Sequence, residues 1–398
     1  MPTSTPSRST ASSPEHNRED ALQRISEKLS SHSARWDREG SFPHEGFDLL
    51  AKSEVLRLPI PAHQGGESAN LEQQRQVIAA IAKGDPSVAL VLAMHYLFLR
   101  SLTPASSWPE KTRQEIYQSV LRYGAIGNAL NVEPDLGTPS RGGLPATVAS
   151  RVGDHWVLNG RKIYATGAPR LNWFAVFGRT AEEPTRTGVF LVFKDPGGHH
   201  PGIEIRETWN HLGMRATGSH EVIFKDVIVT DEHAVDLRVP ADWKKQADPH
   251  RISCIVVLIA TIYDQIARNA LDWLTQFLHD RVPSNLGAAL STLPRVQEKV
   301  GEIAALLYVN HALLGMLTSS SDQGVPVAEA DAYLAKYQIT NNAVRVLEIA
   351  MKLAGNHGLT RDNPLERMYR DVLCGRVHTP QDDMALIKAG LSVLDPQH

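Results

Sequence analysis

Cysteine is scarce in this chain: Cys254 and Cys374 are the only two among 398 residues. Two such cysteines cannot build the disulfide framework of a small secreted domain or a thiolate metal site. Both lie in apolar stretches with helical spacing, so we interpret them as small buried hydrophobic residues. His199 and His200 do not replace them as metal ligands, because they adjoin in a turn without a third ligand at helical spacing. No metal is therefore expected.

An excess of charge of either sign is also missing. The 41 basic and 44 acidic residues give a formal net charge of -3, which offers no field to a polyanion, so no nucleic acid partner is expected. No uncharged apolar run reaches the ~18 residues of a membrane helix, which argues against a membrane partner. Residues 1–20 are rich in Ser, Thr and Pro and lack an apolar core of signal-peptide type. We interpret them as a disordered leader on a cytoplasmic protein.

The rest of the chain divides into three regions, since 398 residues exceed what one core accommodates. Residues 21–124 have helical spacing, with Asn70 and Gln73 placed as a capping box. Residues 125–239 contain short alternating apolar runs, and Asn159-Gly160 after one such run predicts a hairpin turn. In 240–398, apolar residues at steps of three and four predict long helices. We expect a mainly α protein with a β insert: an N-terminal helical domain, a small antiparallel β-barrel or sandwich domain, and a C-terminal four-helix bundle.

Four stretches serve as landmarks in this order: residues 38–47, 158–167, 212–219 and 353–371. They resemble the opening helices, the flavin-facing strand, a further motif and the closing motif of the acyl-CoA dehydrogenase superfamily of flavoproteins. Each stretch alone is weak, but their order and spacing from about Trp36 to Ala389 are specific. The resemblance implies the fold predicted above, a flavin cofactor, an oxidoreductase activity on a small-molecule substrate, and assembly into a homodimer or homotetramer.

The position of the catalytic base departs from this family pattern. Many members carry a catalytic glutamate eight residues after the aspartate of the closing motif, and that position is Thr379 here. Others place the acid early in the first bundle helix, but residues 250–257 contain no carboxylate. A threonine hydroxyl is too weakly basic to remove an α-proton from an acyl thioester. Asp382 and Asp383 lie close by in the sequence, where they also fit the N-terminus of a helix.

His378 stands seven residues after the same aspartate, where reduced-flavin monooxygenases of this superfamily carry a histidine. The dibenzothiophene monooxygenase-like branch, which includes the dibenzothiophene sulfur monooxygenases, is the closest pattern, and the resemblance extends to His95, Asn128 and Thr166. It implies that Thr166 and Asn128 adjust the reactivity of one flavin edge, while His378 and His95 transfer protons. Each also has a structural interpretation. His95 fits a hydrogen-bonded core histidine and Asn128 a turn former. Thr166 fits an ordinary strand residue and His378 a helix C-cap.

Further positions concern the binding of the flavin itself. By resemblance Tyr164 covers the ring, and Val132 offers only a backbone contact where a Thr or Ser is common. The other cofactor-binding positions are Arg281, Lys352, Gly355 and Thr379. Arg281 lacks the Phe-Gly pair that usually follows it, and Lys352 replaces a usual Gln. These departures weaken the expectation of tight FAD binding and favour FMN or a diffusing reduced flavin, although FAD stays open.

We therefore predict a two-component-type monooxygenase that takes reduced flavin from a separate flavin reductase and uses O2 on a small organic substrate. This prediction rests on two observations: no carboxylate stands at either expected position of the base, and His378 stands where the monooxygenases carry a histidine. Two alternatives stay open. One is an FAD-dependent acyl-CoA dehydrogenase whose base is His378 or a downstream aspartate. The other is a non-catalytic, flavin-free homologue that keeps the fold for binding or assembly.

Overall fold

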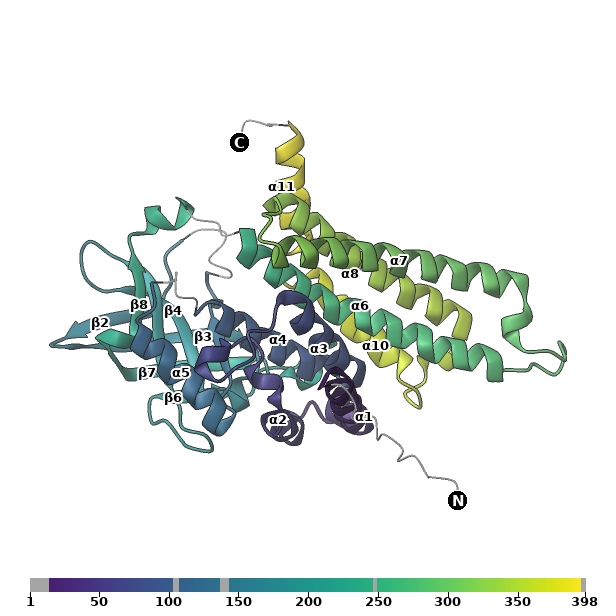
Figure 1. Cartoon of the computed structure of the whole chain (residues 1–398), viewed down its shortest axis with the longest axis horizontal. Helices are drawn as coiled ribbons and strands as arrows, with labels where there is room; N and C mark the ends of the chain where they lie inside the picture. The colour runs from purple at the N-terminus through teal and green to yellow at the C-terminus, as the bar shows by residue number, and fades with distance from the viewer. Residues whose placement is uncertain (1–13, 103–106, 137–142, 246–248, 395–398) are drawn as a thin grey trace, which may run out of the picture.

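The computed structural model describes residues 14–102, 107–136, 143–245 and 249–394. Figure 1 shows three successive regions along the chain: a group of helices, a sheet, and long helices that extend away from the sheet. This order is the predicted one. The expected fold class, mainly α with a β insert between two helical domains, is confirmed.

The N-terminal region is helical, as its spacing predicts. Its α-helices are α1 (Pro14–Glu39), α2 (His44–Ala51), α3 (Leu71–Gly84), α4 (Pro86–Arg100) and α5 (Glu110–Tyr123). The predicted capping box is present, because the Asn70 side chain accepts from the Gln73 N–H at 2.9 Å and the Gln73 side chain from the Asn70 N–H at 3.0 Å. Helix α1 begins at Pro14, so residues 14–20 of the expected leader are helical; residues 1–13 lie outside the described residues.

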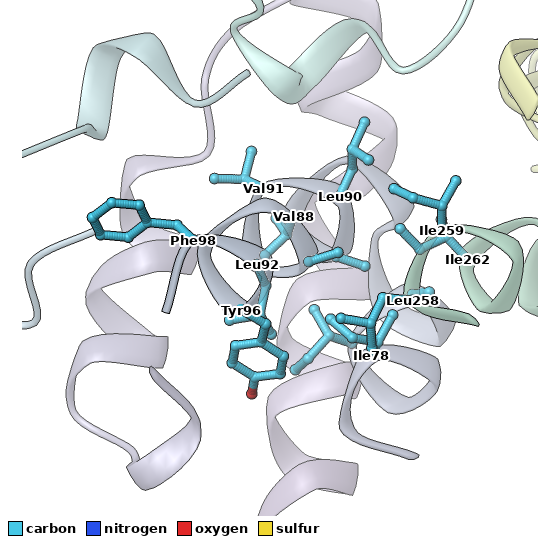
Figure 2. Packing of buried hydrophobic residues seen from close by; sticks show 14 of the residues in the cluster. Ile78, Val88, Leu90, Val91, Leu92, Tyr96, Phe98, Leu258, Ile259 and Ile262 are labelled. Atoms are coloured by element: carbon cyan, nitrogen blue, oxygen red, sulfur yellow. The ribbon is translucent and has the colours of Figure 1, made fainter. Parts of the chain in front are cut away.

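Helix α4 is buried on nearly every side and joins the three regions. Its N-terminus is fixed by Asp85, whose carboxylate accepts from the Val88 N–H at 2.9 Å. Each large apolar side chain that it buries contributes about 1.5–3 kcal/mol. Figure 2 shows this packing between α4, α3 and α6 (Pro249–Asp280), with the labelled contacts Ile78, Val88, Leu92, Leu258, Ile259 and Ile262. The other contacts of α4 include β1 (Gly127–Leu130) and the 3-10 helix Arg215–Thr217.

The middle region is one mixed sheet in which antiparallel pairs dominate. Its strands follow the order β6-β7-β3-β2-β4-β5-β8, and β1 pairs with β4 in parallel. The bounds are β2 (Val148–Val152), β3 (His155–Ala165), β4 (Trp173–Thr180), β5 (Thr187–Phe193), β6 (Ile203–Arg206), β7 (His220–Thr230) and β8 (Ala234–Arg238). The parallel β1 pair places Asn128 opposite Phe174 in the sheet.

The hairpin predicted at Asn159-Gly160 is wrong, because β3 runs straight through both residues. The turn lies earlier, at Gly153 between β2 and β3, where φ is +60°. Long-range contacts decide this. Asn159 exchanges two hydrogen bonds with Asp226 of β7, at 3.0 and 2.9 Å. Gly160 lies at an irregularity of the β3–β7 pairing and is needed there because a Cβ would come within 2.4 Å of Thr147.

The C-terminal region consists of three long helices and shorter ones that pack on them. Helices α6, α7 (Pro294–Asp322) and α8 (Glu329–Ala354) form the bundle. The short α9 (Asn356–Leu359) follows, α10 (Leu365–Leu373) packs against α6 and α8, and α11 (Asp382–Leu394) packs against α8. The predicted fourth bundle helix is therefore represented by these shorter helices.

Two of the long helices are apolar enough to cross a membrane by length and composition alone. They are α6 and α7, whose most apolar windows are 72% and 28% buried in the molecule. Residues 303–321 of α7 carry no Asp, Glu, Lys or Arg, so the run in α7 reaches the length of a membrane helix, interrupted only by uncharged polar residues such as Asn310 and by His311. The window of α6 is explained by its place in the core, and α7 carries the exposed apolar side chains Tyr308, Val309 and Met316.

Candidate functional site

Asn128 and Thr166, predicted to share one flavin edge, are in direct contact. Asn128 is buried on β1, and its side-chain N–H donates to the Thr166 carbonyl at 3.0 Å. Thr166 follows the end of β3, and its Oγ1 lies 2.9 Å from the Ser219 Oγ. The Ser219 Oγ in turn lies 2.8 Å from the Thr217 Oγ1. A chain of three hydroxyl groups therefore orients the Thr166 side chain.

Tyr164 is turned out of the sheet beside this pair. The β3–β7 pairing is irregular between Lys162 and Ala165, and Tyr164 has a φ of +56°. A left-handed conformation costs a non-glycine residue about 1–3 kcal/mol and often marks a functional position. The ring is 53% exposed and stands edge-on to Trp209 and His211, with centroids 6.2 and 6.0 Å away. An exposed aromatic face next to a fixed hydroxyl fits an isoalloxazine ring.

Val132 is held next to Tyr164 through the backbone, since the Ile163 N–H donates to the Val132 carbonyl at 3.0 Å. The following residue, Glu133, anchors this segment. Its carboxylate is buried and accepts from the Lys162 ammonium at 2.6 Å and from the Thr147 hydroxyl at 2.6 Å. Burial opposes ionisation, but these donors outweigh it and hold the pKa of Glu133 below its usual value. The segment that could contact a flavin is therefore rigid up to Glu133.

His95 does not have the free nitrogen that a proton carrier needs. It is fully buried on α4, and its Nδ1 accepts from the Gly127 N–H at 3.2 Å. Its Nε2 lies 3.1 Å from the Leu56 carbonyl, so Nε2 carries the proton and donates. Burial lowers the pKa of His95 to about 4. Of the two interpretations of His95, the geometry matches the hydrogen-bonded core histidine, which positions β1 and hence Asn128.

His378 is half-buried between α10 and α11 and pairs with Tyr263 of α6. Its Nδ1 makes a short hydrogen bond with the Tyr263 hydroxyl. Tyr263 is fully buried, and its hydroxyl has no other hydrogen-bond partner within the described part of the chain. If Nδ1 donated instead, the O–H would remain buried and unpaired at a cost of about 1–3 kcal/mol. The hydroxyl therefore donates, and the single imidazole proton lies on Nε2.

Burial, and to a smaller extent the charge of a buried lysine that sequence reasoning missed, keeps His378 neutral. Burial and the charge of Lys336 together lower the pKa of His378 to about 4. Lys336 lies on α8 with no exposed surface, donates to the Gly375 carbonyl, and is 3.7 Å from the Asp382 carboxylate. Burial lowers its own pKa to about 8. The available signal was a lysine in helical register with the core positions Ala332 and Ile339.

The acidic side chains near His378 have other partners, although the Asp382 Oδ1 is buried without a hydrogen bond among the described residues. Asp382 starts α11 and also accepts from the Asn341 side chain at 2.9 Å. Asp383 accepts from the N–H of the next residue, Met384, at 2.9 Å. Asp371, in the closing motif, accepts from the Met214 N–H at 2.6 Å, and burial raises its pKa to about 7. Thr379 is exposed after His378.

The loop 212–219 links the two halves of the site. At one end Gly213 lies against α10 so closely that a Cβ would come within 2.3 Å of the Arg370 carbonyl oxygen. At the other end it carries Thr217 and Ser219, which orient Thr166. The closing motif therefore contacts the loop that orients Thr166, and His378 follows this motif in the sequence. Asn128, Thr166, Tyr164 and Val132 form one group, and His378 is joined to it through this loop.

Arg281, Lys352 and Gly355 lie elsewhere. All three are exposed at the ends of α6 and α8, which are brought together by the Phe277 and His357 rings at 5.3 Å. Along α6, that end is about 26 Å from Tyr263, at 1.5 Å per residue. Within one chain, these three predicted cofactor residues therefore do not join the His378 group.

Models of one protein family match nearly the whole chain. They are the N-terminal, middle and C-terminal domains of acyl-CoA dehydrogenase, over residues 14–105, 131–227 and 250–384. A putative acyl-CoA dehydrogenase of Bacillus subtilis (strain 168), YdbM, is 32% identical over 367 residues, which are 92% of this chain and 93% of that protein.

Two solved structures are similar to the whole molecule. TdsC from Paenibacillus sp. A11-2, with FMN and indole, has a TM-score of 0.85 at 20% identity and covers 96% of this chain and 98% of its own. Butyryl-CoA dehydrogenase from Megasphaera elsdenii has a TM-score of 0.84 at 18% identity, over 98% of this chain and 100% of its own. At these identities the likeness shows the fold alone. The family models and the relative from Bacillus confirm the predicted resemblance, and the chain belongs to the acyl-CoA dehydrogenase family.

Proposed function

We propose that this protein is a flavin-dependent monooxygenase that uses reduced flavin and O2 on a small organic substrate. The observation that carries the proposal is the Tyr263–His378 pair next to the position where the family places its catalytic glutamate. An imidazole with a pKa of about 4 is a poor acceptor for an α-proton at neutral pH. Its Nε2–H is, in contrast, a fixed donor for an oxygen atom that gains negative charge.

The flavin would be held by the group around Thr166. Tyr164 offers its exposed face, Thr166 its oriented hydroxyl, and Val132 its backbone. When bound, a reduced flavin supplies the two electrons with which O2 is activated for transfer of one oxygen atom to a substrate. Asn128 holds the Thr166 backbone, and the hydroxyl chain through Ser219 prevents Thr166 from turning away. His378 would donate a hydrogen bond from its Nε2–H and keep the proton, because losing it would leave an imidazolate.

The cofactor proposed is FMN, delivered in reduced form by a separate flavin reductase. Arg281 is exposed and is followed by Val282-Pro283, so the side chains that usually hold the adenine end of FAD are incomplete. In an oligomer, the ends of α6 and α8 would face a neighbouring subunit. The exposed apolar side chains of α7, among them Tyr308 at 75% exposure, support a homodimer or homotetramer in which this face is covered.

The test starts from the absorbance spectrum of the purified protein and its affinity for oxidised and reduced FMN. Anaerobic protein with reduced FMN is then mixed with O2, and free H2O2 is followed over time. We expect H2O2 release at least tenfold slower than from free reduced FMN, and faster release from His378→Phe. Indole, which the TdsC structure contains, is the first substrate to add. Immediate release of stoichiometric H2O2 from both proteins would contradict the proposal.

A second candidate is an FAD-dependent acyl-CoA dehydrogenase, which the name of the relative from Bacillus favours. Its base would be His378 or a downstream aspartate, and Asp382 would have to leave the Asn341 side chain to reach a substrate. Anaerobic bleaching of FAD-loaded protein by acyl-CoA of some chain length would support this candidate. A colourless protein without affinity for any flavin would instead indicate a non-catalytic homologue.

A further inference from the structure

A cavity of about 320 Å³ lies where the three regions of the fold meet. It is formed by the end of α1, the start of the loop 212–219 and the segment around α10. Its volume is at the lower end of the ~300–1,000 Å³ of ordinary ligand sites. The charged and ring-bearing lining residues are Asp37, Arg38, His211, Arg215, Arg361 and Arg370.

The lining of this cavity is strongly cationic, although the chain as a whole is not. Four arginines and one aspartate give a formal charge of 4 − 1 = +3. The single carboxylate is already neutralised, because Asp37 accepts from both terminal nitrogens of Arg370 at 2.9 and 2.6 Å. Arg370 also binds Glu366, just outside the lining, at 2.8 Å. Even with Glu366 counted, the charge is 4 − 2 = +2.

The other three guanidinium groups lack a close carboxylate. Arg215 donates to the backbone carbonyls of Asp37 and His211, at 2.7 and 3.1 Å, and its nearest ion-pair distance, to Asp37, is 4.0 Å. Arg38 donates only to the Ala34 carbonyl, at 3.3 Å. Arg361 makes no hydrogen bond or ion pair with any residue that the structure describes. Like charges that face one small cavity repel one another, and an anion placed between them would relieve this repulsion.

One of the arginines, Arg215, is fixed before any ligand arrives: its side chain is only 26% exposed, and its contacts to two backbone carbonyls leave further N–H groups free. Arg370 adds charge but no donor, because all five of its N–H groups are taken by Asp37, Glu366 and the Leu212 carbonyl. A fixed planar guanidinium loses little entropy when it binds the paired oxygens of a phosphate. Arg38 and Arg361 are exposed and complete the ring of donors. Fixed and mobile arginines around one cavity are suited to a ligand with more than one phosphate oxygen.

We propose that this cavity binds the diphosphate group of a small-molecule ligand. His211, which lines the cavity, stacks on Trp209 with centroids 3.6 Å apart and lies edge-on to Tyr164. A bound diphosphate would thus lie beside the aromatic cluster at the end of β3, outside the group formed by Asn128 and Thr166. Binding here requires no flavin and no turnover, so the proposal stands or falls independently of the proposed monooxygenase activity.

The test measures binding of inorganic pyrophosphate and of ADP by calorimetry, in the presence of saturating FMN. We expect saturable binding of pyrophosphate that weakens with added salt, because surface charges are screened. The double variant Arg38→Gln/Arg361→Gln should bind at least tenfold more weakly. Arg122→Gln, an exposed arginine at the end of α5, is the matched control and should bind as the parent does.

Comparing pyrophosphate with ADP shows whether the cavity recognises a diphosphate alone or a diphosphate that belongs to a nucleotide. Tighter binding of ADP than of pyrophosphate assigns the site to a nucleotide, and equal binding assigns it to the diphosphate alone. Absence of saturable binding of both ligands by the parent protein overturns the proposal. So does equal binding by the parent and the double variant, if circular dichroism shows that both are folded.

Discussion

Replacement of Tyr263 by Phe isolates the contact that we consider decisive for His378. The change removes only the hydroxyl that donates to the His378 Nδ1. A hydrogen bond of this kind is worth about 0.5–1.5 kcal/mol net, and the upper end corresponds to about a tenfold preference for the Nε2–H tautomer. Without it, His378 is free to place its proton on Nδ1 and then presents no donor. We expect H2O2 release from the reduced FMN complex to become up to about tenfold faster.

The chain offers a matched control in Tyr96. This side chain is also fully buried, and its hydroxyl donates a single bond, to the Val55 carbonyl at 2.7 Å. Both Tyr→Phe changes leave one partner unpaired and should lower the free energy of unfolding by about 1–2 kcal/mol, measured by urea titration. Only Tyr263→Phe should alter H2O2 release. Equal release by the two variants, whether fast or slow, would refute the role assigned to the Tyr263 hydroxyl.

Three further predictions concern the framework of the site. Because burial lowers the pKa of His95 to about 4 while the unfolded chain keeps ~6.5, His95 alone should contribute about 3 kcal/mol to the fall in the free energy of unfolding from pH 6.5 to pH 4, with a further part from His378; His95→Gln should remove the His95 part of this slope in urea titrations. Gly213→Ala should cost about 3 kcal/mol and lower Tm, whereas Gly301→Ala, with nothing within 4 Å of its Cβ, should not; equal Tm values would contradict this. Tyr308→Glu should lower the mass measured by light scattering, and a parent protein of monomer mass would disprove the covered face.

The features that could be predicted from the sequence are those decided by neighbouring residues. The capping box of Asn70 and Gln73 depends on a spacing of three residues, and it is present. The turn at Asn159-Gly160 was predicted by the same kind of local reasoning and is wrong, because bonds to Asp226 keep β3 extended. Local propensity loses where a distant strand supplies the hydrogen bonds. The order of the three regions, helical, β and helical, was predictable, but the strand boundaries and the register of the sheet were not.

The candidate site could be predicted only in part for the same reason. The resemblance predicted that Asn128 and Thr166 share one flavin edge, which stays a prediction; their direct hydrogen bond was not predicted. For His95 the sequence allowed two interpretations, and only the positions of Gly127 and Leu56 distinguish them. Nothing in the sequence near His378 indicates that Tyr263 will fix its tautomer. That information exists only once α6 lies against the turn after α10.

Lys336 is buried beside the segment that carries His378, and it donates to the Gly375 carbonyl there. Two lysines of the described chain have no exposed surface, and they are compensated differently. Lys162 has the Glu133 carboxylate at 2.6 Å, whereas for Lys336 the nearest carboxylate oxygen is 3.7 Å away, on Asp382. A buried charge with so loose a partner costs stability that a neutral side chain would not. The positive charge of Lys336 adds to burial in lowering the pKa of His378, so the imidazole stays unprotonated and its Nε2–H remains a neutral donor.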